Sequence, residues 1–95
     1  MRIRDKEVNI MTVKELRTFL NEHLVPSKLY KIGGHHNKRI CLEKAGDGWD
    51  LYFSEKKRRI GVMHFKDEGS ACAGMKNELR KMMELMYGLT WAPEK

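Results

Sequence analysis

The first apolar pattern in the chain has the period of an α-helix and lies between residues 12 and 24. Residues at three- and four-residue spacing form one stripe, namely Val13, Leu16, Leu20 and Leu24, with Phe19 beside them. Thr12 and Glu15 match a capping box, in which the hydroxyl and the carboxylate each accept a free backbone N–H. Pro26 then disfavours helical geometry in the residue before it. The pattern predicts a helix from about residue 12 to residue 24.

From residue 28 to residue 54 the apolar pattern takes the two-residue period of β-strands. Residues 28–32 alternate loosely and predict a first strand. In the next strand Ile40 and Leu42 share one face, while Cys41 and Glu43 lie on the other. In the strand after it one face carries Trp49, Leu51 and Phe53 and the other carries Asp50, Tyr52 and Ser54. The Gly46-Asp-Gly48 cluster between these two strands predicts an antiparallel hairpin with one covered face and one wet face.

A further strand is predicted from residue 60 to residue 65, but its pattern does not alternate cleanly. Ile60 and Val62 lie on one face, and Met63 lies on the other with Gly61 and Phe65. A β-bulge near Gly61 would let both sets of side chains reach the core, since glycine interrupts strands where the backbone must kink. The sequence leaves the register of this strand open.

The last apolar stripe again has helical spacing and is expected to be core. It consists of Cys72, Met75, Leu79, Met82, Met83 and Met86. Asp67 and Ser70 supply an acidic, cap-like start, and Gly88 is a typical stop. The order of the elements predicts an α+β fold: a three- or four-stranded antiparallel meander with an N-terminal and a C-terminal helix packed on one face.

The composition is that of a small globular protein. The 95 residues are 41% hydrophobic and 34% charged, which allows one thin core, so a single domain over residues 1–95 is expected. Residues 1–10 are expected to form a flexible arm or a short edge strand, and residues 89–95 a tail. No run approaches the ~20 apolar residues of a membrane helix, and the N-terminus lacks the apolar centre of a secretion signal. For Cys41 and Cys72, buried free thiols in a reducing cytoplasm are favoured over a disulfide.

The charge of the chain indicates the kind of partner. Nineteen Lys and Arg residues against thirteen Asp and Glu residues give a net charge of +6, which attracts polyanions, either nucleic acid or an acidic protein face. Four of the cations, Lys56, Lys57, Arg58 and Arg59, form a run at a predicted hairpin tip. There they could clamp phosphates while Tyr52 stacks a base. One functional hypothesis is therefore a small nucleic-acid-binding regulator.

The sequence contains no coherent reaction centre. His35 and His36 are adjacent in a polar loop and are interpreted as solvated, because adjacent histidines rarely converge on one metal ion. His64 is interpreted as a structural or surface histidine. Asp47 and Glu55 stand roughly 20 Å or more apart at ~3.3 Å per strand residue, too far to share a Mg²⁺ ion. We therefore expect no enzymatic activity, no metal, no cofactor and no small-molecule substrate. An enzyme of unknown class is the third alternative, and it would require partners of His64, or of His35 and His36, that the sequence does not show.

The central part of the chain carries a set of scattered residues that form a recognisable pattern. They are Tyr30-Lys-Ile-Gly33, Ile40-Cys-Leu-Glu-Lys44, Gly46-Asp-Gly-Trp49, Leu51-Tyr-Phe-Ser-Glu55, Arg59, Gly61, Phe65 and Ala71-Cys72. Over roughly residues 29–73 this pattern resembles the small bacterial immunity proteins of contact-dependent growth inhibition and related polymorphic toxin systems. Those proteins neutralise toxin domains.

The resemblance implies a cytoplasmic, non-enzymatic inhibitor that binds one cognate toxin domain, typically a nuclease, and blocks it by steric and electrostatic means. Three modes stay open: binding through local carboxylates, binding to an acidic toxin surface, or binding away from the toxin's catalytic centre. The exposed faces of the predicted meander supply the candidate toxin-binding residues, which are Glu43, Asp47, Asp50, Tyr52, Glu55, Lys57 and Arg58. Trp49, Leu51, Phe53 and Phe65 are assigned to the core.

Overall fold

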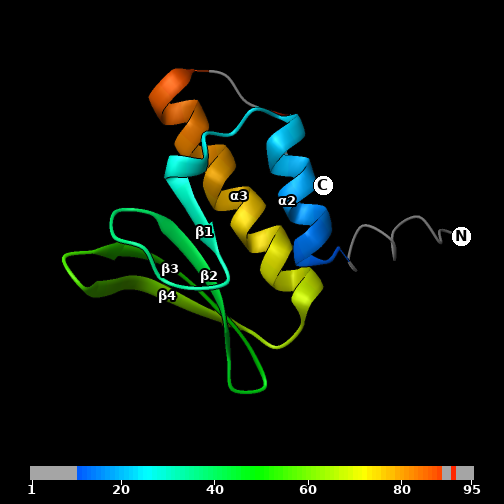
Figure 1. Ribbon diagram of the computed structural model, residues 1–95, viewed down its shortest axis with the longest axis vertical. Helices are drawn as coiled ribbons and strands as arrows, with labels where there is room; N and C mark the ends of the chain where they lie inside the picture. Colours follow the sequence, from blue (N-terminus) through cyan, green and yellow to red (C-terminus); the bar gives the residue numbers. More distant parts are fainter. Residues whose placement is uncertain (1–10, 89–90, 92–95) are drawn as a thin grey trace, which may run out of the picture.

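The computed structural model describes residues 11–88 and residue 91 and contains two helices beside a four-stranded sheet (Figure 1). In chain order the elements are α2 (Val13–Glu22), the 3₁₀ helix η1 (Ser27–Leu29), β1 (Tyr30–Ile32), β2 (Ile40–Ala45), β3 (Gly48–Glu55), β4 (Arg58–Phe65) and α3 (Glu68–Tyr87). The predicted α+β fold is confirmed. The expected arm at residues 1–10 and most of the tail at 89–95 lie outside the described residues.

Three of the four helix ends follow the signals in the sequence, whereas α2 ends at Glu22, two residues before the predicted end. Leu24 of the predicted apolar stripe is 83% exposed, which corrects its placement in that stripe. Thr12 caps α2, with its side chain and that of Glu15 forming the predicted capping box. Asp67 caps α3 by accepting the backbone N–H of Ser70 at 2.7 Å. Gly88 ends α3 with φ of 73°, a left-handed conformation that glycine adopts without a steric penalty.

The sheet has the order β1-β2-β3-β4, and its first pair differs from the expectation. Strands β2, β3 and β4 form the predicted antiparallel meander, whereas β1 runs parallel to β2, with Tyr30 opposite Ile40. Residues 33–39 are the cause, because they carry the chain back past the sheet and do not form a tight turn. This return loop is fastened by three backbone bonds: the Gly33 N–H donates to the Leu42 carbonyl at 2.8 Å, the Lys38 N–H donates to the Ser54 carbonyl at 2.6 Å, and the Ser54 N–H donates to the Arg39 carbonyl at 3.0 Å.

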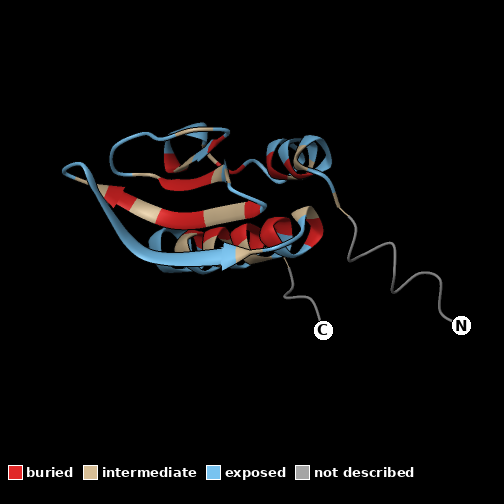
Figure 2. Cartoon of the chain, turned by 90° about the horizontal axis from the view of Figure 1, so that it is seen from below, coloured by how far each residue is buried: buried red, intermediate tan, exposed pale blue. Residues whose placement is uncertain are grey.

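The predicted bulge in β4 is confirmed, but its expected consequence is wrong. Leu51 pairs with Met63 and Phe53 pairs with Ile60, so β4 has one residue more than β3 in this interval. Gly61 lies there with φ of 65°, as in bulges that begin with a left-handed glycine. The neighbouring apolar side chains nevertheless stay outside the core: Ile60, Val62 and Met63 are 44%, 47% and 39% exposed. β4 is an edge strand, and Figure 2 shows it exposed along nearly its whole length.

The core lies between the sheet and the helices, and it begins with the two leucines of α2. Leu16 and Leu20 are fully buried. They pack in one cluster with Ile32, Ile40, Leu42, Leu51, Ala71, Cys72, Met75, Leu79 and Met83. Trp49, Phe53 and Phe65 are partly buried against this cluster, as expected. Met86 is exposed, which corrects its assignment to the core, and both cysteines are buried and free.

Candidate functional site

The face of the sheet turned away from the core carries a network of charged side chains centred on Arg59. This guanidinium lies over the ring of Tyr52, with Cζ 4.3 Å from the ring centroid. Its Nη2 donates to Asp50 Oδ2 at 2.9 Å and to Glu43 Oε2 at 3.1 Å. One side chain of β4 therefore joins carboxylates from β2 and β3. The hydrogen bond to Asp50 raises the pKa of Arg59 further, which keeps the arginine charged.

His64 extends this network toward the turn between β2 and β3. Its Nδ1 lies 2.8 Å from Asp50 Oδ1, and its Nε2 lies 3.6 Å from Asp47 Oδ1. The bond from His64 lowers the pKa of Asp50, and the same bond raises the pKa of His64. His64 is thus a surface histidine that its carboxylate neighbours hold toward the charged form.

A second cluster forms where the return loop crosses the end of β3. The two ring nitrogens of His35 lie 3.1 Å from the Tyr52 hydroxyl and 2.9 Å from the Ser54 hydroxyl. His35 is therefore more than the solvated loop residue that the sequence indicated. Tyr52 is only 2% exposed, and burial raises its pKa to about 12. The expectation of an exposed Tyr52 is wrong, so its ring is not free to stack a base.

The seven candidate residues from the sequence divide into two groups. Glu43, Asp50 and Tyr52 meet around Arg59, and Asp47 joins them through His64. Glu55, Lys57 and Arg58 lie at the turn between β3 and β4. The carboxylates on the open face are therefore engaged with cations of the same chain, while the cations of the turn point to solvent.

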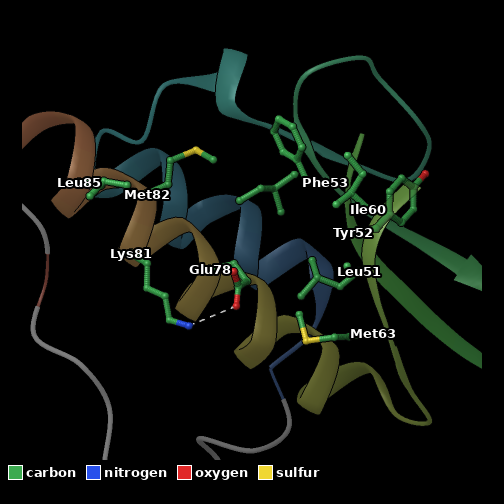
Figure 3. Close-up of a pocket in the computed structure, with 11 residues that line it drawn as sticks. Leu51, Tyr52, Phe53, Ile60, Met63, Glu78, Lys81, Met82 and Leu85 are labelled. Atoms are coloured by element: carbon green, nitrogen blue, oxygen red, sulfur yellow. Dashed lines mark ion pairs between the residues drawn. The ribbon is translucent and has the colours of Figure 1, made fainter. Parts of the chain in front are cut away.

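An open groove with a volume of about 350 Å³ lies between the edge of the sheet and α3 (Figure 3). We call it the apolar groove. Ile60 and Met63 of β4 line one side, and Met82 and Leu85 of α3 line the other. Leu51 and Phe53 are among its remaining apolar residues. The Glu78–Lys81 ion pair, with 3.5 Å between Lys81 Nζ and Glu78 Oε2, places charges at its margin.

Sequence reasoning missed the apolar groove because it assigned both sides of it to the core. Its one signal was the irregular alternation around Gly61, which indicated a strand that does not present a single apolar face. The exposed fraction of Leu85 is 88%, the largest among the exposed apolar side chains of the described residues. Leu85 also lies off the methionine stripe from which the core of α3 was predicted.

The described residues contain neither a metal-binding cluster nor a membrane-crossing helix. Residues 11–88 and 91 hold no group of three or more His, Cys, Asp or Glu side chains placed to bind a metal ion. Among the described helices, none has the length and apolar character needed to cross a membrane.

Comparison with known proteins places the chain in no family. No protein-family model, no curated protein and no solved structure matches it.

Proposed function

We propose that this chain is a cytoplasmic immunity protein and that its cognate toxin domain docks in the apolar groove. One observation carries the proposal: Ile60, Met63 and Leu85 are exposed around a single groove, although a small protein needs its apolar side chains for its core. Protein interfaces commonly combine an apolar, well-packed centre with a polar rim. Contiguous apolar surface on a small protein commonly marks such an interface.

The charges beside the groove favour an acidic partner surface. Lys57 and Arg58 are exposed and precede Ile60 in the chain, so cations stand next to one end of the groove. Glu43 and Asp50, the carboxylates best placed to imitate nucleic acid, are already bound by Arg59. Of the three binding modes, this arrangement supports attachment to an acidic toxin surface, with an apolar projection of the toxin filling the groove.

The resemblance of residues 29–73 to immunity proteins supplies the class of partner. The groove and its cationic end supply the mode of attachment. Inhibition is then steric, because this protein, once bound to the toxin domain, blocks the access of substrate to the toxin.

The proposal predicts that the gene immediately upstream encodes a secreted protein with a variable C-terminal domain, and the test uses that domain as the toxin probe. Wild-type chain is expected to form a complex with this domain and to restore growth of cells that express it. The variant Leu85→Arg places a charge in the groove and should weaken the complex about 30-fold or more, the loss typical of an interface hot spot. Leu24→Arg is the matched control, because Leu24 is also highly exposed, at 83%, follows the C-cap of α2 and does not line the groove.

Two results would contradict the proposal. If the wild-type chain neither binds the upstream domain nor protects cells, the assignment as an immunity protein is wrong. If Leu85→Arg binds as tightly as Leu24→Arg, the groove is not the docking site. Calorimetry and growth rescue with the same proteins distinguish these two failures.

A further inference from the structure

Two loops meet at one end of the sheet and form a cationic hollow, whose Lys57 also belongs to the cationic end of the groove proposed for the toxin complex. The hollow has a volume of about 450 Å³ and is lined by His35, His36, Asn37, Lys56 and Lys57. We refer to these five residues as the basic corner. All of them are exposed. Lys38 and Arg58, which are also exposed, adjoin it in the chain and add two more cations.

Hydrogen bonds hold the two loops of the basic corner in place. The backbone N–H of Lys56 donates to Asn37 Oδ1 at 2.8 Å, which ties the turn to the return loop. His35 is fixed by Tyr52 and Ser54. The cations are therefore presented from a preformed framework, and a ligand would bind without first ordering the backbone.

Unlike Arg59, the lysines of the basic corner and the neighbouring Arg58 have no acidic partner in the part of the chain that the structure describes. Within residues 11–88 and 91, no ion pair joins a carboxylate to Lys56, Lys57 or Arg58. The nearest carboxylate in the chain, that of Glu55, belongs to a partly buried residue at the end of β3. The positive charge at this corner is thus available to an external anion.

The backbone of the turn supplies an independent observation. Lys56 and Lys57 have φ of 51° and 67°, and positive φ at both loop residues is the pattern of a type I′ turn. Such turns strongly favour Asn-Gly, because side chains with a Cβ are disfavoured in this conformation. Lys38, in the facing loop, also has a positive φ of 61°. Lysine at these positions costs local backbone strain and at the same time brings positive charges close together. Backbone strain of this kind is often found at functional sites.

We propose that the basic corner binds the phosphate groups of a polyanion. A tetrahedral phosphate offers several acceptor oxygens to the ammonium groups of the turn and to the imidazole of His36 in the return loop, whereas a carboxylate is satisfied by a single guanidinium fork. Because Tyr52 is buried and Arg59 is engaged with Asp50, the site has no base-stacking platform of the kind expected from the sequence. Recognition is therefore of phosphate charge and does not depend on base sequence.

The experiment separates the turn's charge from its shape. Lys56→Asn with Lys57→Gly installs the preferred turn and removes two charges. Lys56→Arg with Lys57→Arg keeps the charges and the strained turn. Lys14→Gln with Lys28→Gln removes two charges from exposed positions outside the basic corner and is the matched control. Binding of the full chain to tripolyphosphate and to a short single-stranded RNA is measured across a salt series, with an acidic peptide as competitor.

The Asn-Gly variant is expected to be more stable and to bind less. Its Tm should rise by about 4–8 °C, which also shows that it folds. Its affinity for the RNA should fall at least tenfold, and the slope of log K against log salt should shrink by about 1.4, or ~0.7 for each lost contact to a single strand. The Arg-Arg variant and the Gln-Gln control should both stay within about twofold of wild type. Competition by tripolyphosphate would identify free polyphosphate as a ligand, and binding of RNA alone would identify the nucleic-acid backbone.

Three results would overturn the proposal. The first is equal loss of affinity in the Asn-Gly variant and the Gln-Gln control, which would mean that only net charge matters. The second is that neither phosphate probe binds in a saturable manner. The third is displacement of the RNA by the acidic peptide at the same charge concentration, which would make the corner a site for acidic proteins. None of these outcomes depends on the toxin complex, since Leu85 and the basic corner are tested separately.

Discussion

At the scale of single residues, the charged network on the face of the sheet turned away from the core depends on Asp50, whose two carboxylate oxygens bind different partners. Oδ2 accepts a hydrogen bond from Arg59 and Oδ1 accepts one from His64. The largely buried carboxylate of Asp50 therefore holds two cationic side chains of β4 in place. Each cation is too exposed to contribute much by itself, as is usual for surface ion pairs. Their shared partner gives them a defined geometry, which is what a recognition surface needs.

The coupling between Asp50 and His64 predicts a specific dependence on pH. The pKa of His64 is raised above its ordinary 6.5, so its contribution to stability is complete below that pH and is lost as pH rises through the folded pKa. The pKa of Asp50 is lowered from 3.8, so its contribution is present above that pH and is lost as pH falls through the folded pKa. The contact between Asp50 and His64 therefore contributes its full stabilisation between pH 3.8 and pH 6.5, and this stabilisation is lost at more acidic and at more basic pH.

NMR titration of the His64 ring checks this prediction. In the wild-type chain the midpoint should lie above 6.5, and Asp50→Asn should lower it. Glu43→Gln is the control, since it removes another partner of Arg59 and leaves the contact between His64 and Asp50 intact. An unchanged midpoint in Asp50→Asn would mean that the hydrogen bond is absent in solution.

At the scale of elements, α2 is attached to the rest of the fold by a narrow apolar stripe. Leu16 and Leu20 are its two buried residues, and both belong to the common core. Two hydrogen bonds supplement this packing: the N–H of Val13 donates to Glu68 Oε2 at 2.8 Å, and Nη2 of Arg17 donates to the Ile32 carbonyl at 3.1 Å. The helix is short, so these contacts and not intrinsic helix propensity keep it folded.

Truncation of one core leucine should therefore be costly. Leu20→Ala is expected to lower the free energy of unfolding by about 3 kcal/mol, from lost burial and an unfilled cavity. Leu24→Ala removes the same atoms from a side chain that is 83% exposed, and it should change the free energy by less than about 0.5 kcal/mol. Denaturant unfolding measures both, and equal effects would show that α2 is not packed as described.

At the scale of the whole molecule, the parts predictable from sequence are those with local causes. The caps at Thr12 and Asp67, the stop at Gly88 and the bulge at Gly61 each follow from a few neighbouring residues. The parallel pairing of β1 and the open groove depend on which element covers which, and apolar periodicity carries no such information. For the same reason the sequence predicts Ile60 and Met63 to be core residues. In the described chain, however, no helix or strand covers the sheet edge on which they lie.

The extra residue at Gly61 has a consequence in crowded solution. An unbroken edge strand presents evenly spaced donors and acceptors to any other extended chain, which invites sheets to grow from copy to copy. The bulge interrupts that spacing, and the exposed Arg58 adds repulsion between identical molecules. The fold can thus leave its apolar groove uncovered and still resist assembling into fibrils with itself.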